Sequence, residues 1–401
     1  MSCRRSSTST DGENYHRKLL NVAVQEMGHL VTVQNLLLLL GGREAIYLQR
    51  DLRRRKSPKN PLPFILDPVS LTSLALYVTA EKPAEVPEAQ RARVEELARR
   101  AFDATGVEPH RVGVIYAVLR WMFLPPEEAG AWIDLPGLAP LPANPHLSEA
   151  DLAPPEQVLP FQAMPVEWQA DAAEGFLLHT PLTLPQAVAA IDAIAEQGEG
   201  LTDCGCSHFA EFIEMADAFE AGHFTALPLA VSPSLGTGNG GERGEAISND
   251  YTKLWGEIFS LHYTLLLLTI HHALVTPRPP EEEEGSGLRG DLIRLAFKSM
   301  RRFIGTLSSL VGALPLQPAG AAALAGPPYD LNPDDLPSDA LRDLVRLHLR
   351  LLERLVALYS RVEMAGEFPA NPKHRIMLAN LRAFDLERTT LFAPPPPPPI
   401  V

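Results

Sequence analysis

The segment 21–42, NVAVQEMGHLVTVQNLLLLLGG, constrains the fold of this chain more than any other stretch. We predict one long helix here, because the apolar residues recur at helical spacing and the run ends at Gly41-Gly42, a common helix C-terminal signal. Glu26 and His29 lie three residues apart, so both side chains share one helix face in a mostly apolar environment. A buried carboxylate beside a buried imidazole is costly unless something neutralises the pair. A metal ion would do so, and an inward-pointing Glu-x-x-His is a ligand pattern of metal-binding helical bundles.

A second group of metal-ligand residue types lies in segment 195–214, AEQGEGLTDCGCSHFAEFIE. Glu196 and Glu199 end one predicted helix at spacing three, and His208 and Glu211 begin the next at the same spacing. If the two segments pack together, these residues complete a two-metal site with the first pair. Mixed carboxylate and imidazole ligands suit iron or manganese. The alternative is a glycine-terminated helix followed by a capped helix, with the acidic residues in solvent.

Zinc is a second interpretation of this segment. Cys204, Cys206 and His208 form a C-x-C-x-H string, but structural zinc takes four ligands. The sequence holds no second Cys/His cluster of standard spacing, so iron is favoured. Three more histidines, His262, His271 and His272, lie on an apolar helix, and we interpret them as core or surface residues.

Composition excludes several classes of partner. Of the 401 residues, 46% are hydrophobic and 21% are charged, as in a folded soluble protein with a large core. A formal net charge of −14 argues against binding to nucleic acid or to an anionic membrane. The apolar run 36–40 is too short to cross a bilayer. Three cysteines argue against a disulfide scaffold, and the polar N-terminus has no signal-peptide core, so we expect a cytoplasmic protein.

We predict a mainly α chain with long proline-rich loops. The expected parts are a disordered N-terminus over 1–14, a first domain over 15–232 with a proline-rich insertion at 125–165, a flexible linker over 233–249, a C-terminal helical region over 250–392, and a polyproline tail over 393–401. Helices are expected over 15–40, 71–77, 87–103, 112–124, 184–200, 207–219, 251–275, 288–314 and 338–364. The tail would be solvated or would bind a small adaptor domain.

Four segments, in this order, resemble the ferritin-like domain of the iminophenyl-pyruvate dimer synthase family: 26–42, 60–83, 112–123 and 193–215. The strings EMGHLVTVQNLLLLLGG and EQGEG…SHFAEF carry most of the resemblance, which extends over residues 16–220. Its members include enzymes that couple two tryptophan-derived imines on the way to violacein, rebeccamycin and related bisindoles. The resemblance implies a ferritin-like helical bundle, one or two iron ions, and a small substrate derived from an amino acid.

The resemblance also implies site residues. Glu26, His29, Glu199 and His208 would be the catalytic and metal-binding residues, with Glu196 and Glu211 as further ligands. The same residues would alternatively act without metal, a carboxylate–imidazole pair serving as acid and base for imine coupling.

The sequence departs from the family at two points. Family members carry an early Glu on a helix before the E-M-x-H helix, whereas here the preceding stretch is short and polar. A chain rising about 1.5 Å per residue cannot form a bundle helix and its turn in that length. We therefore expect the bundle to lack its first helix, or to receive it from another part of the chain or from a second copy in a homodimer. Gly28 replaces a larger apolar residue, at a cost of up to about 1 kcal/mol in helix stability.

The expected function is an iron-dependent oxidative or imine-coupling enzyme of secondary metabolism. The alternative is a non-catalytic ferritin-like scaffold or binding protein with a degenerate metal site. The missing first helix and the polyproline tail favour the scaffold. The Glu and His residues retained at both clusters favour the enzyme, because a site without function could have filled those positions with apolar residues.

Overall fold

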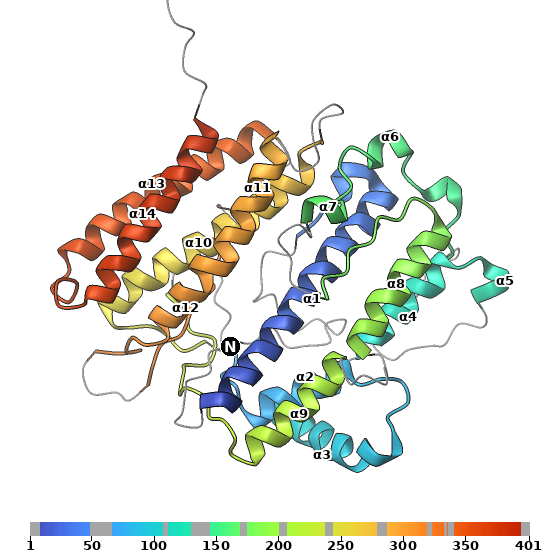
Figure 1. Ribbon diagram of the computed structural model, residues 1–401, viewed down its shortest axis with the longest axis horizontal. Coiled ribbons are helices and arrows are strands. Elements are labelled where there is room, and N and C mark those ends of the chain that lie inside the picture. The colour runs from blue at the N-terminus through green and yellow to red at the C-terminus, as the bar shows by residue number, and fades with distance from the viewer. Residues whose placement is uncertain are drawn as a thin grey trace, which may run out of the picture. The chain divides into compact units, whose positions relative to one another are not determined.

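The structure is a computed structural model. It describes residues 9–48, 66–106, 111–129, 145–168, 175–199, 207–236, 244–278, 287–318, 323–332, 335 and 341–393. Among these residues the secondary structure is helical, and the β pairings are isolated bridges, which confirms the expected mainly α fold class. The chain divides into two compact units (Figure 1): unit 1 comprises Met1–Tyr47 and Arg53–Pro228, and unit 2 comprises Leu48–Leu52 and Leu229–Val401.

Unit 1 is organised along α1, Ser9–Gly41, a helix of 33 residues (Figure 1). This helix begins earlier than expected, so residues 9–14, which we expected to be disordered, form its first turns. After α1 comes a 3₁₀ turn, Gly42–Ala45, in which Gly42 has φ of 64°, a left-handed conformation that favours glycine.

Two groups of helices pack along α1. The first group is α2 (Leu71–Glu81), α3 (Glu88–Thr105) and α9 (His208–Glu220), in which α2 contacts both of the others. The second group is α4 (Val112–Phe123) with α8 (Leu184–Glu199). Both α8 and α9 contact α1, and they follow one another along it (Figure 1). The end of α8 and the start of α9 therefore lie near the middle of α1.

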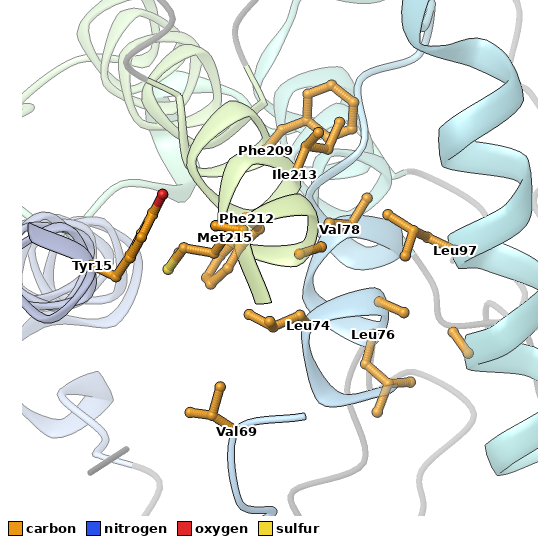
Figure 2. Close-up of a cluster of buried hydrophobic side chains, with 14 of the residues drawn as sticks. Tyr15, Val69, Leu74, Leu76, Val78, Leu97, Phe209, Phe212, Ile213 and Met215 are labelled. Atoms are coloured by element: carbon orange, nitrogen blue, oxygen red, sulfur yellow. The ribbon is translucent and has the colours of Figure 1, made fainter. Parts of the chain in front are cut away.

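Each group has its own apolar core. Figure 2 shows the first core, where Leu74 of α2 and Phe212 of α9 gather with Tyr15 of α1. The second core contains Leu39 of α1 and Ile191 of α8. Burying one large apolar side chain contributes about 1.5–3 kcal/mol. The first core packs against the N-terminal half of α1 and the second core against its C-terminal half. The polar residues of α1 between the two cores lie where the two groups of helices meet.

The proline-rich insertion forms only short helices in the residues that the structure describes: α5 (Pro126–Ala129), η2 (Glu149–Asp151), α6 (Pro155–Val158) and, just after them, α7 (Pro165–Trp168). Prolines exclude longer helices here, and residues 130–144 lie outside the described residues. Asn35 of α1 holds the end of this segment, because its Nδ2 donates to the Ala163 carbonyl and its Oδ1 accepts from the Ala163 N–H, each at 2.9 Å. The buried amide in an apolar helix thus replaces missing secondary-structure hydrogen bonds.

Unit 2 is built around α10, Asp250–Val275, which contacts α11 (Gly287–Lys298), α12 (Gly305–Val311) and α13 (Leu341–Met364). A π-helical turn, Ser299–Ile304, separates α11 from α12, and a helix that we did not expect, α14 (Pro372–Phe392), contacts α11 and α13. By length and composition α10 is apolar enough to cross a membrane. However, 89% of its apolar 18-residue stretch is buried inside the structure, and the core helix of a soluble protein has the same properties.

The segment expected to be a flexible linker, 233–249, is partly ordered. The Ser234 N–H donates to the Glu245 carbonyl at 2.9 Å, and the Ile247 N–H donates to the Ser234 carbonyl at 2.8 Å. The Glu245 carboxylate also accepts from the Val231 N–H at 2.7 Å. These hydrogen bonds join the two ends of the segment. Residues 237–243 and the expected polyproline tail from 394 onward lie outside the described residues.

Candidate metal centre

Three potential metal ligands from three helices meet near the middle of α1. They are Glu26 of α1, Glu81, which is the last residue of α2, and His208, which is the first residue of α9. One ligand atom from each lies within 4.8 Å of the other two. His208 is fully buried and Glu81 is 8% exposed, whereas the Glu26 side chain is 49% exposed. The group is therefore enclosed except on the side of Glu26.

Local sequence explains why the helices begin and end here. Ser70 opens α2 through a capping box with Ser73, and Lys82-Pro83 follows Glu81, where a residue before proline disfavours continued helix. Ser207 caps α9 by accepting from the Ala210 N–H at 3.3 Å. Helices α2 and α8 both end here, and each C-terminus carries a partial negative charge. Only one helix, α9, begins here and contributes a partial positive charge from its N-terminus. The net helix-terminus potential favours a cation.

Two histidines, His29 and His208, each face the Glu26 carboxylate with their Nδ1 atom. Nδ1 of His208 lies 3.1 Å from Oε1 of Glu26, and Nδ1 of His29 lies 3.4 Å from Oε2. The two ring centroids are 5.7 Å apart. Nδ1 of His208 is buried and makes no hydrogen bond. Buried polar atoms of native proteins almost always have a partner, so this nitrogen fits the position of a metal ligand.

The charge state of Glu26 fits a cation site as well. Burial raises the pKa of the Glu26 carboxyl, but interactions with the imidazoles of His208 and His29 outweigh burial and lower the pKa to about 2. The carboxylate is therefore ionised at neutral pH. Two carboxylates with an imidazole form a donor set that suits iron, manganese or zinc.

Gly198 of α8 leaves room at the group. A Cβ atom on this residue would lie 3.2 Å from Oε2 of Glu81 and 3.9 Å from Nδ1 of His208. A side chain here would therefore crowd two of the three candidate ligands. Glycine lets the last turn of α8 approach the group by its backbone.

The structure brings three of the expected site residues together: Glu26, His29 and His208. It does not bring Glu196 or Glu211 to the group. Glu196 is exposed on α8, and Glu211 forms an ion pair of 2.9 Å with Lys18. Glu211 lies about one turn further along α9 than His208, and there it meets Lys18 instead of the group.

Several expected residues lie elsewhere. The side chain of Glu199 and both cysteines of the C-x-C-x-H string, Cys204 and Cys206, lie outside the described residues. Three histidines of unit 2 are buried in its core: His262, His271 and His272.

Three residues at the group were missed by the sequence analysis: Glu81, Gln25 and Gln197. The signal for Glu81 was present, because it is the one charged residue of the apolar segment LTSLALYVTAE. We expected the helix that carries the additional carboxylate to be missing, or to come from another part of the chain or from a second copy. In the structure the additional carboxylate, Glu81, comes from α2, the helix that follows α1. The glutamines gave no signal, since their hydrogen bonds to His208 and His29 join residues far apart in the sequence.

A family model described as ferritin-like matches residues 6–131. The matched segment contains α1 to α4, and so includes Glu26, His29 and Glu81. No curated protein and no solved structure matches the chain significantly. The match and the helices that it covers support a ferritin-like domain over residues 6–131 of a mainly α chain, and the group of Glu26, Glu81 and His208 could hold a metal ion.

Proposed function

We propose that unit 1 binds one iron ion through Glu26, Glu81 and His208, and that it catalyses an oxidative or imine-coupling reaction on a small amino-acid-derived molecule. The observation that supports this most is the convergence of these ligands from three helices around a buried ring nitrogen that makes no hydrogen bond. A di-iron site of the ferritin-like class takes a Glu from each of two helices and two Glu-x-x-His motifs. The described side chains offer fewer ligands, enough for one ion.

Iron, when bound, would supply a redox centre and a Lewis acid. The surrounding residues would perform three tasks. Glu26, Glu81 and His208 would hold the ion. Glu81 and His208 are buried, whereas Glu26 lies on the exposed side, from which a small molecule would reach the ion. Nδ1 of His29 lies beside Glu26 but outside the group of three, and it would take up or release a proton there as a general base or acid.

The reaction type and substrate class rest on the resemblance to the iminophenyl-pyruvate dimer synthases. A cytoplasmic location and a homodimer remain predictions from sequence.

A second candidate function is a ferritin-like scaffold without catalysis. One observation favours it: the Glu26 carboxylate already contacts both imidazoles, so the group has partners in the metal-free state. The scaffold and the enzyme differ in metal content, which is measured first, and in turnover of imines or oxygen, which is then measured on the iron-loaded protein.

The test is the iron content of protein purified from iron-supplemented medium, measured by elemental mass spectrometry. We expect near-stoichiometric iron in the wild type and loss of iron in Glu81→Gln and in His208→Gln. Circular dichroism should show that both variants keep their helices. Glu196→Gln is the matched control, because this exposed carboxylate lies outside the group, and it should retain the iron.

Three outcomes would contradict the proposal in whole or in part. Folded wild-type protein without bound metal would favour the scaffold. Full iron content in both ligand variants would show that the metal lies elsewhere. If the iron-loaded protein turned over neither imines nor oxygen, the proposed metal site would stand but the proposed enzymatic activity would be wrong.

A further inference from the structure

We propose that Gln25 and Gln197 are positioning residues of the metal centre. Each glutamine accepts a hydrogen bond from Nε2 of one histidine, so that Nδ1 of that histidine faces Glu26. Nδ1 is then the ring atom that is free to bind metal or to exchange a proton. This inference rests on the proposed metal site, and its test separates the two.

Gln25 holds His208. Its Oε1 atom lies 2.8 Å from Nε2 of His208. A neutral imidazole has one N–H donor and one bare nitrogen. If the one proton were on Nδ1, a bare Nε2 would face the Gln25 oxygen at 2.8 Å, and two acceptors would meet in a buried place. The proton therefore belongs on Nε2, where it donates to Gln25 and leaves the Nδ1 lone pair facing Glu26.

Gln197 holds His29 in the same way. Its Oε1 atom lies 2.8 Å from Nε2 of His29. The orientation of the Gln197 amide is fixed, because its NH₂ group donates to the carbonyl of Gly175 at 2.8 Å. The oxygen must then face the imidazole, and only a protonated Nε2 can donate to it. Nδ1 of His29 is left facing Glu26 at 3.4 Å.

Gly175 supports both glutamines. Besides accepting from Gln197, it lies against Gln25, since a Cβ atom at this position would be 2.8 Å from Nε2 of Gln25. Gly175 has φ of 89°, a left-handed conformation that side chains rarely adopt. The backbone of Gly175 thus lies against two side chains on different helices, Gln25 of α1 and Gln197 of α8, and binds the second of them.

The arrangement has the chemistry of a metal site. Metal-binding histidines usually donate the N–H of the other ring nitrogen to an acceptor, which fixes the ring and the tautomer. The facing atoms here are two bare nitrogens and the two oxygens of one carboxylate, all of which are acceptors. Such a set is stable only with a cation among them, a metal ion or a proton. Removal of the outer hydrogen bond in other metal sites lowers metal affinity about 10- to 100-fold.

The test uses Zn²⁺ as a diamagnetic probe on the full chain labelled with ¹⁵N-histidine. Long-range ¹H–¹⁵N spectra distinguish Nδ1 from Nε2, and His208→Gln assigns the signals. We expect Zn²⁺ to shift Nδ1 of His208 and to leave Nε2 protonated. In Gln25→Leu we expect the Nε2–H signal to be lost to exchange with water and Zn²⁺ affinity to fall about 10- to 100-fold. Gln25→Glu, which keeps an acceptor, should restore both.

Gln162→Leu is the matched control. This buried glutamine of the proline-rich insertion donates to a backbone carbonyl as Gln197 does, in its case that of Pro181 at 3.0 Å. It should leave the affinity and the histidine signals unchanged. Zn²⁺ shifting Nε2 of His208, or Gln25→Leu binding Zn²⁺ within twofold of the wild type, would overturn the inference. A wild type that binds no metal but keeps both Nε2–H signals would overturn the proposed function while supporting the positioning of the rings.

Discussion

A Cβ atom on Gly28 of α1 would lie 2.3 Å from the carbonyl oxygen of Leu177. Real Cβ atoms do not approach an oxygen so closely, so the chain that leads from Gly175 crosses α1 at a position where a side chain is absent. This crossing explains why glycine replaces the larger apolar residue expected in the middle of the helix. It also places Gly175 next to the glutamines of the candidate site.

We predict that Gly28→Ala destabilises unit 1 although alanine is the better helix former. The clash is with backbone atoms, and overpacking of this kind costs about 1–3 kcal/mol. Gly305→Ala is the control, because a Cβ there meets nothing within 4 Å, and it should stabilise the protein by up to about 1 kcal/mol. Urea unfolding followed by circular dichroism measures both, and equal effects of the two substitutions would contradict the crossing.

The helices were largely predictable from sequence, because apolar periodicity and caps are local signals. The expected spans 112–124, 184–200 and 251–275 differ by a residue or so from α4, α8 and α10. Helix α14 was missed because its apolar residues are not separated clearly from its polar ones: its buried side includes His374, Asp385 and Arg388.

The candidate site was only partly predictable. Glu26, His29 and His208 carried signals in residue type and spacing, but spacing alone also selected Glu196 and Glu211. Glu211 has a closer partner in Lys18, which no local pattern reveals. Glu81 joins the group because α2 and α9 pack together. The local spacing of apolar residues does not predict which distant segments pack against each other.

A second prediction concerns the pH dependence of the metal-free protein. The folded pKa of Glu26, about 2, lies below the ordinary value of 4.5. The unfolded chain therefore binds more protons between these values, and stability rises with pH through that window. The contribution of Glu26 should be fully present above pH 4.5 and lost as the pH falls towards 2.

Urea unfolding of the wild type and of Glu26→Gln at several pH values measures this contribution. The difference in unfolding free energy should be constant above pH 4.5 and should shrink below it. Glu196→Gln, an exposed carboxylate of the same unit, is the control. A difference independent of pH down to 2 would show that the imidazoles do not stabilise the ionised carboxylate.

A third prediction places an acid-sensitive step in unit 2. Burial lowers the pKa of His272 from 6.5 to about 4. Its ring lies 5.5 Å from that of His348, whose pKa burial also lowers, with a smaller effect from His272 itself. Because the folded state keeps these rings neutral, stability should be full above pH 6.5 and fall as the pH drops towards 4.

One pKa unit corresponds to about 1.4 kcal/mol, so His272 alone accounts for a loss on the order of 3 kcal/mol. His272→Phe should remove part of the acid sensitivity of unit 2 in urea unfolding between these pH values. His223→Gln, an exposed histidine of unit 1, should leave it unchanged. Identical pH profiles for the wild type and His272→Phe would contradict the assignment.

The last prediction concerns a buried network at Arg388 of α14. The guanidinium is fully buried and donates to Asp385 at 3.2 Å, to Nδ1 of His262 at 3.0 Å and to Ser299 at 3.1 Å. Tyr359 completes the network, since its hydroxyl donates to Asp385 and lies 2.8 Å from Nε2 of His262. The π-helical turn that begins at Ser299 breaks the α-helical register at this contact.

Removing Arg388 leaves the Asp385 carboxylate buried without its cation, and breaking such a pair costs about 3–5 kcal/mol. Arg388→Met should therefore be strongly destabilising, whereas Arg388→Met with Asp385→Leu should recover much of the loss, because neither charge remains to be solvated. Arg382→Met is the control on the same helix: it breaks an exposed pair with Glu363 and should cost about 0–1 kcal/mol. A double variant as unstable as the sum of its single variants in urea unfolding would show that Arg388 and Asp385 are not coupled.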